Sequence, residues 1–156
     1  MGFDNLVRDL QNGLGMVRVN AATQLGKLKE RRAEKALIEA LKDENMAVRN
    51  NAAFALGEIG SQRAVPDLIL LLRDREERVR KSAAKALGMI GAGDAVTALV
   101  NALDEDESSI VRKSAIRSLG QIGGTRALKA VEPFMSGPDA TLADMARKAV
   151  EMIRKQ

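Results

Sequence analysis

A short motif recurs along this chain at a nearly constant interval, and this recurrence restricts the fold more than any other feature of the sequence. The four copies read VRVNAATQLGKLK at 17–29, VRNNAAFALGEIG at 48–60, VRKSAAKALGMIG at 79–91 and VRKSAIRSLGQIG at 111–123. The second residue of each copy is an arginine, and the steps between these arginines are 31, 31 and 32 residues (Arg18, Arg49, Arg80 and Arg112). Self-similarity at such a period is typical of proteins built from stacked structural repeats.

Each unit of the repeat is predicted to be a pair of antiparallel helices. Val48, Ala52, Leu56 and Ile59 lie at i, i+4, i+8 and i+11, which is one apolar stripe of an α-helix. A second apolar cluster precedes each copy, such as the run Leu68 to Leu72, and predicts another helix. A single pair cannot bury its apolar face, so stacked pairs must supply the core. We therefore expect an all-α fold, an α-α superhelix of five helix-turn-helix repeats forming one solenoid domain over 1–156 (1–29, 30–60, 61–91, 92–123 and 124–156).

The fifth repeat departs from the pattern in the way that a terminal cap requires. The positions expected to face a following repeat are apolar or glycine in the earlier copies but are Glu132, Arg147 and Glu151 in the last. A polar outer face suits the end of a stack, so the chain is expected to end where the domain ends. Pro133 lies within the first helix of this repeat and should kink or shorten it.

The composition argues against catalysis. The chain contains no cysteine and no histidine, which excludes disulfides and thiol chemistry and removes the commonest general base and transition-metal ligand. No nucleophile–base pair is visible, so we expect no enzyme activity, no cofactor and no metal site. The run Leu68 to Leu72 is too short to span a bilayer, and Asp4, Arg8 and Asp9 stand where a signal peptide needs an apolar run. No membrane association and a cytoplasmic location are expected.

The motif VR-x-x-A-A-x-A-L-G-x-I-G resembles the short HEAT-like repeats named after phycobilisome lyase subunits, and the resemblance covers nearly the whole chain. It implies a solenoid whose second helices line a concave face. Two groups of enzymes are built from similar repeats, and the sequence argues against both. For deoxyhypusine hydroxylase, the resemblance implies a His-Glu metal-binding pattern, which this chain cannot supply because it has no histidine. HEAT-like DNA glycosylases rely on aromatic residues, and this chain has no Trp or Tyr.

Three of the recurring arginines follow an aspartate by six residues: Asp43 and Arg49, Asp74 and Arg80, Asp106 and Arg112. Asn12 stands at this offset from Arg18. One interpretation is an arginine row that binds phosphate. The favoured interpretation is a structural ladder, in which each arginine donates charge-assisted hydrogen bonds to an Asp of its own or the adjacent repeat.

Four glycines recur at one position of the motif, near the ends of the second helices (Gly26, Gly57, Gly88 and Gly120). Phosphate-binding glycines lie at helix N-termini, so close helix packing is the favoured role here.

The variable positions of the second helices are expected to point out of the core, among them Ala55, Ala86, Ser118 and Ala149. Basic residues outnumber acidic residues in this variable set, and the whole chain has a net charge of +4. A face with such an excess attracts acidic partners, although a solvated lysine surface is the alternative. The candidate partner-binding residues are Asn51, Phe54, Glu58, Lys81, Lys85, Met89, Lys113, Arg117, Gln121 and Lys148.

The leading hypothesis is a protein–protein interaction scaffold that binds an acidic segment of a partner on a concave, basic face. Phe54, Met89 and Met145 would be apolar anchors. An alternative is nucleic-acid binding through phosphates, although the basic set lacks aromatic residues for stacking. A third hypothesis is an accessory subunit of a bilin-lyase-type complex. The sequence does not identify the partner.

Overall fold

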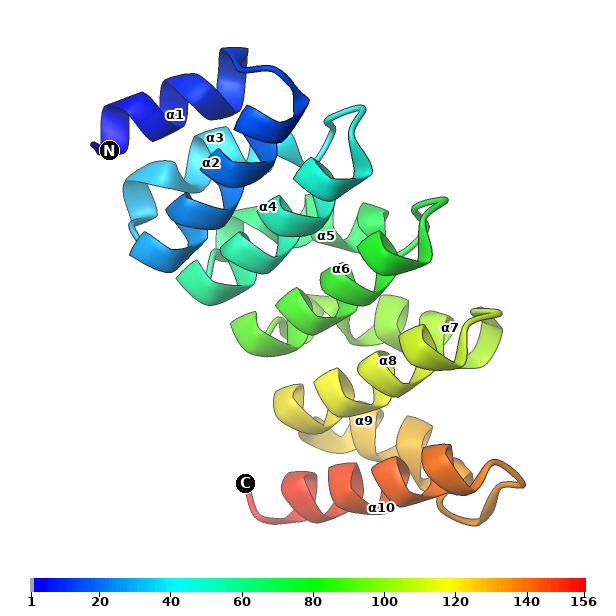
Figure 1. Cartoon of the computed structure of the whole chain (residues 1–156). Helices are drawn as coiled ribbons and strands as arrows, with labels where there is room; N and C mark the ends of the chain where they lie inside the picture. The colour runs from blue at the N-terminus through cyan, green and yellow to red at the C-terminus, as the bar shows by residue number, and fades with distance from the viewer. Residues whose placement is uncertain (1) are drawn as a thin grey trace.

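The computed structural model describes residues 2–156, which form ten α-helices and four short 3-10 segments and contain no strand (Figure 1). The helices pair along the chain and the pairs stack in a row, so that the two termini lie at opposite ends (Figure 1). The predicted all-α superhelix is thus confirmed. The α-helices are α1 (Phe3–Asn12), α2 (Gly15–Leu28), α3 (Glu34–Ala40), α4 (Met46–Ile59), α5 (Val65–Leu71), α6 (Glu77–Ile90), α7 (Val96–Glu105), α8 (Ser109–Ile122), α9 (Gly124–Val131) and α10 (Ala140–Arg154). The 3-10 segments are η1 (Arg31–Ala33), η2 (Gln62–Ala64), η3 (Gly93–Ala95) and η4 (Glu132–Ser136).

Polar side chains define where several second helices begin. The side chain of Asn45 accepts a hydrogen bond from the first turn of α4, and Ser108 does the same for α8. Asp139 accepts from two backbone N–H groups of α10. Each bond satisfies a donor that the helix itself leaves unpaired, which fixes the position of the turn between the paired helices.

Glycine and proline define other boundaries. Gly60 ends α4 in the left-handed conformation, with a φ of 73°, which an L-residue with a side chain rarely adopts. Pro66 occupies the first turn of α5, where its missing N–H costs no hydrogen bond. Helix α9 ends at Val131, two residues before Pro133, as expected for a residue that cannot continue a helix.

One apolar core runs through the whole stack, and it is built from equivalent residues of successive repeats. The largest fully buried side chains include a leucine from the same motif position of the first four second helices (Leu25, Leu56, Leu87 and Leu119). Leucines from the first helices complete these layers (Leu37, Leu68 and Leu99). Because each layer draws on two helices and on the neighbouring repeat, no pair is a self-sufficient unit.

The second helices α2, α4, α6, α8 and α10 pack closely against one another in chain order, whereas α3, α5 and α7 make few contacts among themselves. The recurring glycines permit this close approach. A Cβ atom on Gly57 would lie only 2.9 Å from the Cα of Ala86 on the next second helix. Equivalent approaches join Gly26 to Ala55, Gly88 to Ser118 and Gly120 to Ala149.

This packing corrects one expectation from the sequence. Ala55, Ala86, Ser118 and Ala149 do not point out of the core but are buried. Their variation is restricted to small side chains because each one faces the glycine of the preceding second helix.

Candidate partner-binding surface

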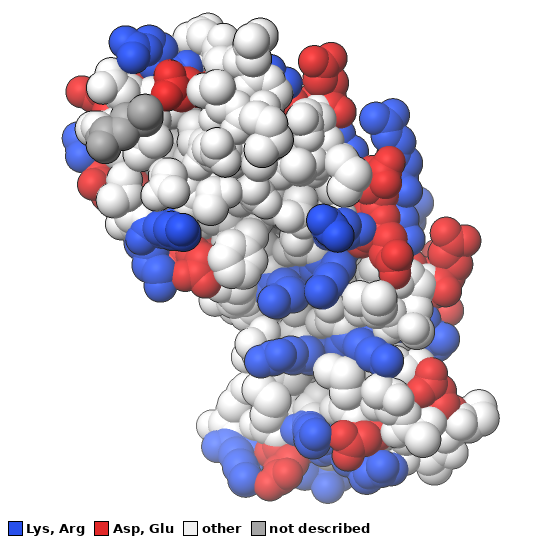
Figure 2. Space-filling model, in the orientation of Figure 1, with Lys and Arg blue, Asp and Glu red and all other residues white. Residues whose placement is uncertain are grey.

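The outward faces of α4, α6, α8 and α10 together form what we call the second-helix surface. Every candidate partner-binding residue lies on it and is exposed or half-buried. Phe54 is 43% exposed and Met89 is 37% exposed, which is high for side chains of this size and hydrophobicity. In Figure 2, Lys and Arg side chains gather in bands across the middle of this surface.

Four cations form the centre of the surface, and we call them the α6–α8 basic patch: Lys81, Lys85, Lys113 and Arg117. Two come from α6 and two from α8, at i and i+4 in each helix, so each pair projects from one side of its helix. None of the four forms an ion pair with an acidic side chain of residues 2–156. No direct ion pair within the described chain therefore neutralises their charge, although Lys113 acts at longer range on Asp139 and helps to lower its pKa.

The charged candidates outside the basic patch, Glu58 on α4 and Lys148 on α10, do form ion pairs. The Glu58 carboxylate lies 2.8 Å from the amino group of Lys29, and Lys148 lies 2.9 Å from Asp144 on its own helix. Lys148 lowers the pKa of Asp144 through a hydrogen bond and its charge. Among the charged candidates, those without an ion pair in residues 2–156 therefore lie on α6 and α8.

Apolar surface adjoins the basic patch. The Nζ of Lys85 lies 5.7 Å from the centre of the Phe54 ring, so the ammonium of α6 rests near the aromatic face of α4. The thioether of Met89 reaches back toward α4, 3.2 Å from where a Cβ atom on Gly57 would lie. The candidate Gln121 is exposed near the end of α8, and its side chain approaches Gly88.

A chain of hydrogen bonds crosses three repeats on the same surface. The Ser82 hydroxyl donates to Asn50 Oδ1 at 2.6 Å, and Asn50 donates to Asn51 Oδ1 at 3.0 Å. Asn51 then donates to the Thr23 hydroxyl at 2.9 Å. These residues and Phe54 line a hollow of about 290 Å³ between α2, α4 and α6. Asn51 is therefore held in place by its neighbours, and Phe54 forms part of the wall of a preformed hollow.

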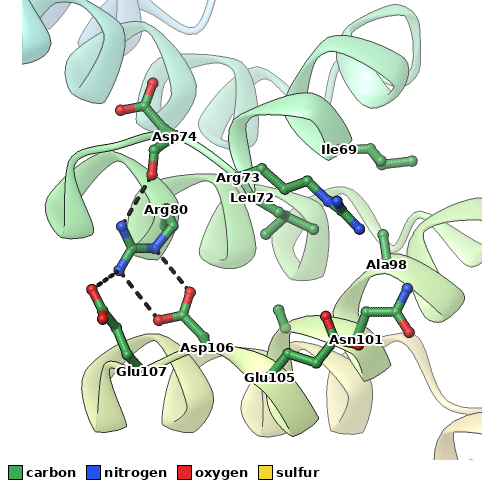
Figure 3. A pocket seen from close by; sticks show the side chains of 11 residues that line it. Ile69, Leu72, Arg73, Asp74, Arg80, Ala98, Asn101, Glu105, Asp106 and Glu107 are labelled. Atoms are coloured by element: carbon green, nitrogen blue, oxygen red, sulfur yellow. Dashed lines mark hydrogen bonds and ion pairs between the residues drawn. The ribbon is translucent and has the colours of Figure 1, made fainter.

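The predicted ladder aspartates lie at the turns between paired helices, and the ladder arginines lie in the first turn of the second helices. Arg49 donates to both carboxylate oxygens of Asp74, at 3.0 and 3.1 Å. Arg80 donates to Asp106 in the same way, at 2.8 and 3.2 Å (Figure 3). The bond to Asp106 is the main reason that the pKa of Arg80 is raised.

Each of these arginines uses the aspartate of the following repeat for its side-chain bonds. Its own repeat contributes a backbone carbonyl, that of Asp43 for Arg49 and that of Asp74 for Arg80. The same geometry extends to the first repeat, where Arg18 bonds Asp43 at 2.8 and 3.1 Å. Sequence spacing missed this pair because Asn12, and not an aspartate, precedes Arg18 by six residues.

The expectation that Arg112 bonds an aspartate of its own or the adjacent repeat is wrong. Within residues 2–156 its only side-chain hydrogen bond goes to the carbonyl of Leu103, at 2.8 Å, and its guanidinium lies 5.8 Å from the centre of the Phe134 ring. The reason is that Gly137 occupies the position two residues before the N-cap of α10, where the earlier repeats have aspartate. The ladder thus ends one repeat before the stack does.

A cleft of about 570 Å³ opens beside Arg80, where the first helices α5 and α7 stand apart. Figure 3 shows Ile69, Arg73 and Asn101 around it, with Asp106 at one side. The ladder residues Asp74, Arg80 and Asp106 form part of the wall of this cleft. None of the candidate partner-binding residues lines it. Separately, no helix within residues 2–156 is both long and apolar enough to cross a membrane.

Comparison with known proteins places the chain in a family. The family model described as HEAT repeats matches residues 6–83 and 65–151. No curated protein is a significant sequence match to this chain.

Solved structures agree with this assignment. A chain of the complex of CpcE and CpcF of phycocyanin lyase from Nostoc is 31% identical with a TM-score of 0.88, and the alignment covers 100% of this chain and 66% of that one. The chain thus spans slightly less than two thirds of that relative. A designed armadillo repeat protein in complex with the peptide (KR)4 is 26% identical with a TM-score of 0.74, covering 97% of this chain and 81% of that one.

Human deoxyhypusine hydroxylase is 19% identical with a TM-score of 0.62, covering 99% of this chain and 74% of that one, and shows the fold alone. The expected resemblance to the HEAT-like repeats of phycobilisome lyases is confirmed by the family match and by the similarity to the phycocyanin lyase complex. The chain belongs to the family of HEAT repeats.

Proposed function

We propose that this chain is a non-catalytic scaffold whose second-helix surface binds an acidic segment of a partner protein. The observation that carries the proposal is the α6–α8 basic patch, in which four cations from two neighbouring repeats have no acidic side chain paired with them in residues 2–156. A surface region of one charge sign attracts ligands of the opposite sign and speeds their association. The repeat architecture, a rigid stack with an extended surface, suits a binding role.

The dimensions of the patch suit a segment with several carboxylates. Residues at i and i+4 of one helix are about 6 Å apart, and packed helices lie about 8–10 Å apart. The four cations therefore occupy an area that two or three neighbouring acidic side chains of one segment can cover. Phe54 and Met89 adjoin this area and offer the apolar contact that interface centres favour.

The packing of the stack supports a concave shape for this surface. The second helices lie close together and the first helices stand apart, and a stack curves toward the side where its elements are closer. The designed armadillo repeat protein, which is similar in fold, is in complex with a basic peptide. On the present chain the exposed charges of α6 and α8 are positive, so a peptide of the opposite sign is the complementary ligand.

Nucleic acid is the competing ligand for a basic surface. Phe54 is the only aromatic residue of the second-helix surface, so stacking with successive bases has no counterpart there. Binding would rest on phosphate contacts alone and would fall steeply with salt.

The test is a fluorescence anisotropy titration with three labelled probes: an Asp/Glu-rich peptide that contains one Phe, a duplex DNA and a single-stranded RNA. Each is measured at about 50 and about 200 mM salt. We expect the peptide to bind more tightly than either nucleic acid at the higher salt concentration. Tighter binding of DNA or RNA at both salt concentrations, or no binding of the peptide at either, would contradict the proposal.

A second candidate function is an accessory subunit of a bilin-lyase-type complex. It is favoured by the 31% identity over the whole chain to a component of the CpcE and CpcF complex. Affinity purification of the tagged chain from its source organism tests it. Recovery of a second HEAT-repeat chain together with a pigment protein would support this role, and recovery of neither would count against it.

A further inference from the structure

The N-terminal end of the stack carries an apolar face that no described residue covers. Leu14 is 84% exposed, Val17 is 42% exposed and Leu28 is 47% exposed, and all three lie on α2 or directly before it. In Figure 2 the surface over α2 is largely uncharged, whereas charged side chains lie along the edge near α1. This face lies on the opposite side of α2 from α4 and is separate from the α6–α8 basic patch.

The positions of Val17 and Leu28 have equivalents in the next repeat, and these equivalents are buried in the stack. Val48 occupies the position of Val17 one repeat later and is fully buried, and Ile59 occupies the position of Leu28 and is only 8% exposed. Ile90 and Ile122, at the same position in the next two repeats, are half-buried. Each later second helix packs against the second helix before it, whereas within residues 2–156 no second helix precedes α2. Val17 and Leu28 are therefore helix-packing positions that face solvent within residues 2–156.

The exposed face is also hollowed in a way that fits a helix. A groove of about 490 Å³ runs between α1 and α2. Its apolar lining comes from Leu6, Val17, Ala21 and Leu28, and its polar lining from Asp9, Asn20 and Gln24. Ala21 at its floor allows another backbone to come close, because its side chain is a single methyl group.

The spacing of these residues suits a second helix as the occupant of the groove. Leu14, Val17, Ala21, Gln24 and Leu28 are separated by 3, 4, 3 and 4 residues, which is the alternation of the a and d positions of a coiled coil. We propose that a second copy of this chain packs its α2 antiparallel against this face, forming a two-fold symmetric dimer. This inference is independent of the proposed function.

The face is self-complementary about one point. A two-fold axis midway between Ala21 and Gln24 places Val17 opposite Leu28 of the second copy, and Leu28 opposite its Val17. The same axis sets Ala21 against Gln24 in both central layers. Apolar pairs therefore close both ends of the contact, and the two Gln24 side chains stand near the axis, where one polar residue fixes register.

The opposite end of the stack excludes a head-to-tail contact. Glu132 pairs with Arg154 at 3.2 Å and Glu151 pairs with Lys155 at 2.7 Å, so the outer face of the last repeat is covered by charged groups. Burying these pairs against Val17 and Leu28 would desolvate charge without compensation. Contact between two N-terminal faces avoids this cost and yields a closed dimer instead of a filament.

Sedimentation velocity of the full chain over about 1–300 µM tests the dimer. We expect the mass to rise to twice that of the chain, and Leu28→Glu to keep it monomeric throughout. The matched control is Leu70→Glu, which changes an exposed leucine on α5, far from this face, and should dimerise like the wild type. Thermal melting of both variants checks that they are folded. A wild type that stays monomeric, or a Leu28→Glu variant that dimerises as well as the control, overturns the proposal.

Disulfide capture tests the antiparallel arrangement. Because the wild type has no cysteine, only the introduced cysteines can form a disulfide. In one chain, positions 17 and 28 are about 16 Å apart along α2 and cannot be linked to each other. The proposal predicts that oxidising a mixture of Val17→Cys and Leu28→Cys gives dimers containing one of each, while either variant alone stays largely monomeric. Efficient linking of either variant to itself would show a different register or a parallel contact and contradict the proposed axis.

Discussion

Arg49 and Asp74 are joined by two charge-assisted hydrogen bonds across the boundary between the second and third repeats. Both side chains are nearly buried, at 8% and 9% exposed. The Asp74 carboxylate also accepts a bond from the backbone N–H of Glu76 at 2.9 Å, so one group fixes the turn of its own repeat and holds the arginine of the previous one. The ladder thereby couples the local turn geometry to the stacking of repeats.

Replacing a ladder arginine should lower the free energy of unfolding most where the change leaves a buried carboxylate without its ion-pair partner. Arg80→Ala leaves Asp106 mostly buried and unpaired, and should lower the free energy of unfolding by about 1–3 kcal/mol. Arg112→Ala should cost less, because no carboxylate of residues 2–156 forms an ion pair with Arg112. Lys85→Ala should cost least, because Lys85 is only half-buried and has no ion pair there. Urea unfolding of the three variants measures the order. Equal midpoints for Arg80→Ala and Lys85→Ala would show that the ladder contributes no stability.

Restoring the missing aspartate should add stability. Gly137 has an extended backbone, with φ of −73° and ψ of 166°, and a Cβ atom there would make only ordinary contacts, the nearest at 3.5 Å from the Phe134 carbonyl. Gly137→Asp places a carboxylate where Arg112 can use it, and should stabilise the fold by about 0.5–1 kcal/mol. The gain should disappear when Arg112→Ala is combined with it, which thermal melting of the double variant checks. A gain that persists in the double variant would have to come from the turn alone.

The glycines of the second helices should not tolerate a side chain. Gly57→Ala introduces a Cβ atom 2.9 Å from the Ala86 backbone, and the resulting separation of α4 and α6 should cost about 1–3 kcal/mol. Gly93→Ala is the control, since nothing lies within 4 Å of its Cβ position. The two are compared by chemical denaturation. If they were equally stable, close packing would not be the reason for glycine at 57.

The repeat period made the fold predictable from the sequence, because the apolar stripe of each copy needs a second helix and a neighbour to bury it. The outward position of the exposed Phe54 and of the half-buried Lys85 also followed, since both break the motif on a helix face already identified as outward. Two features did not follow. A six-residue offset between Asp74 and Arg80 does not reveal that the carboxylate of Asp74 binds the arginine of the previous repeat. Variation at Ala86 indicated exposure, although it reflects tolerance of small side chains in a tight contact.

We propose above that the α6–α8 basic patch selects an acidic partner. Its most direct test is parallel selection from one random peptide library against the wild type, the reversal variant Lys85→Glu with Arg117→Glu, and the control Lys35→Glu on α3. The reversal should leave the melting temperature nearly unchanged, since neither side chain is fully buried or forms an ion pair within residues 2–156. We predict that peptides from the wild type and the control are enriched in Asp and Glu, and that the reversal variant loses this enrichment. Selection of the same peptides by the wild type and the reversal variant, or no acidic enrichment by the wild type, would contradict the assignment of this surface.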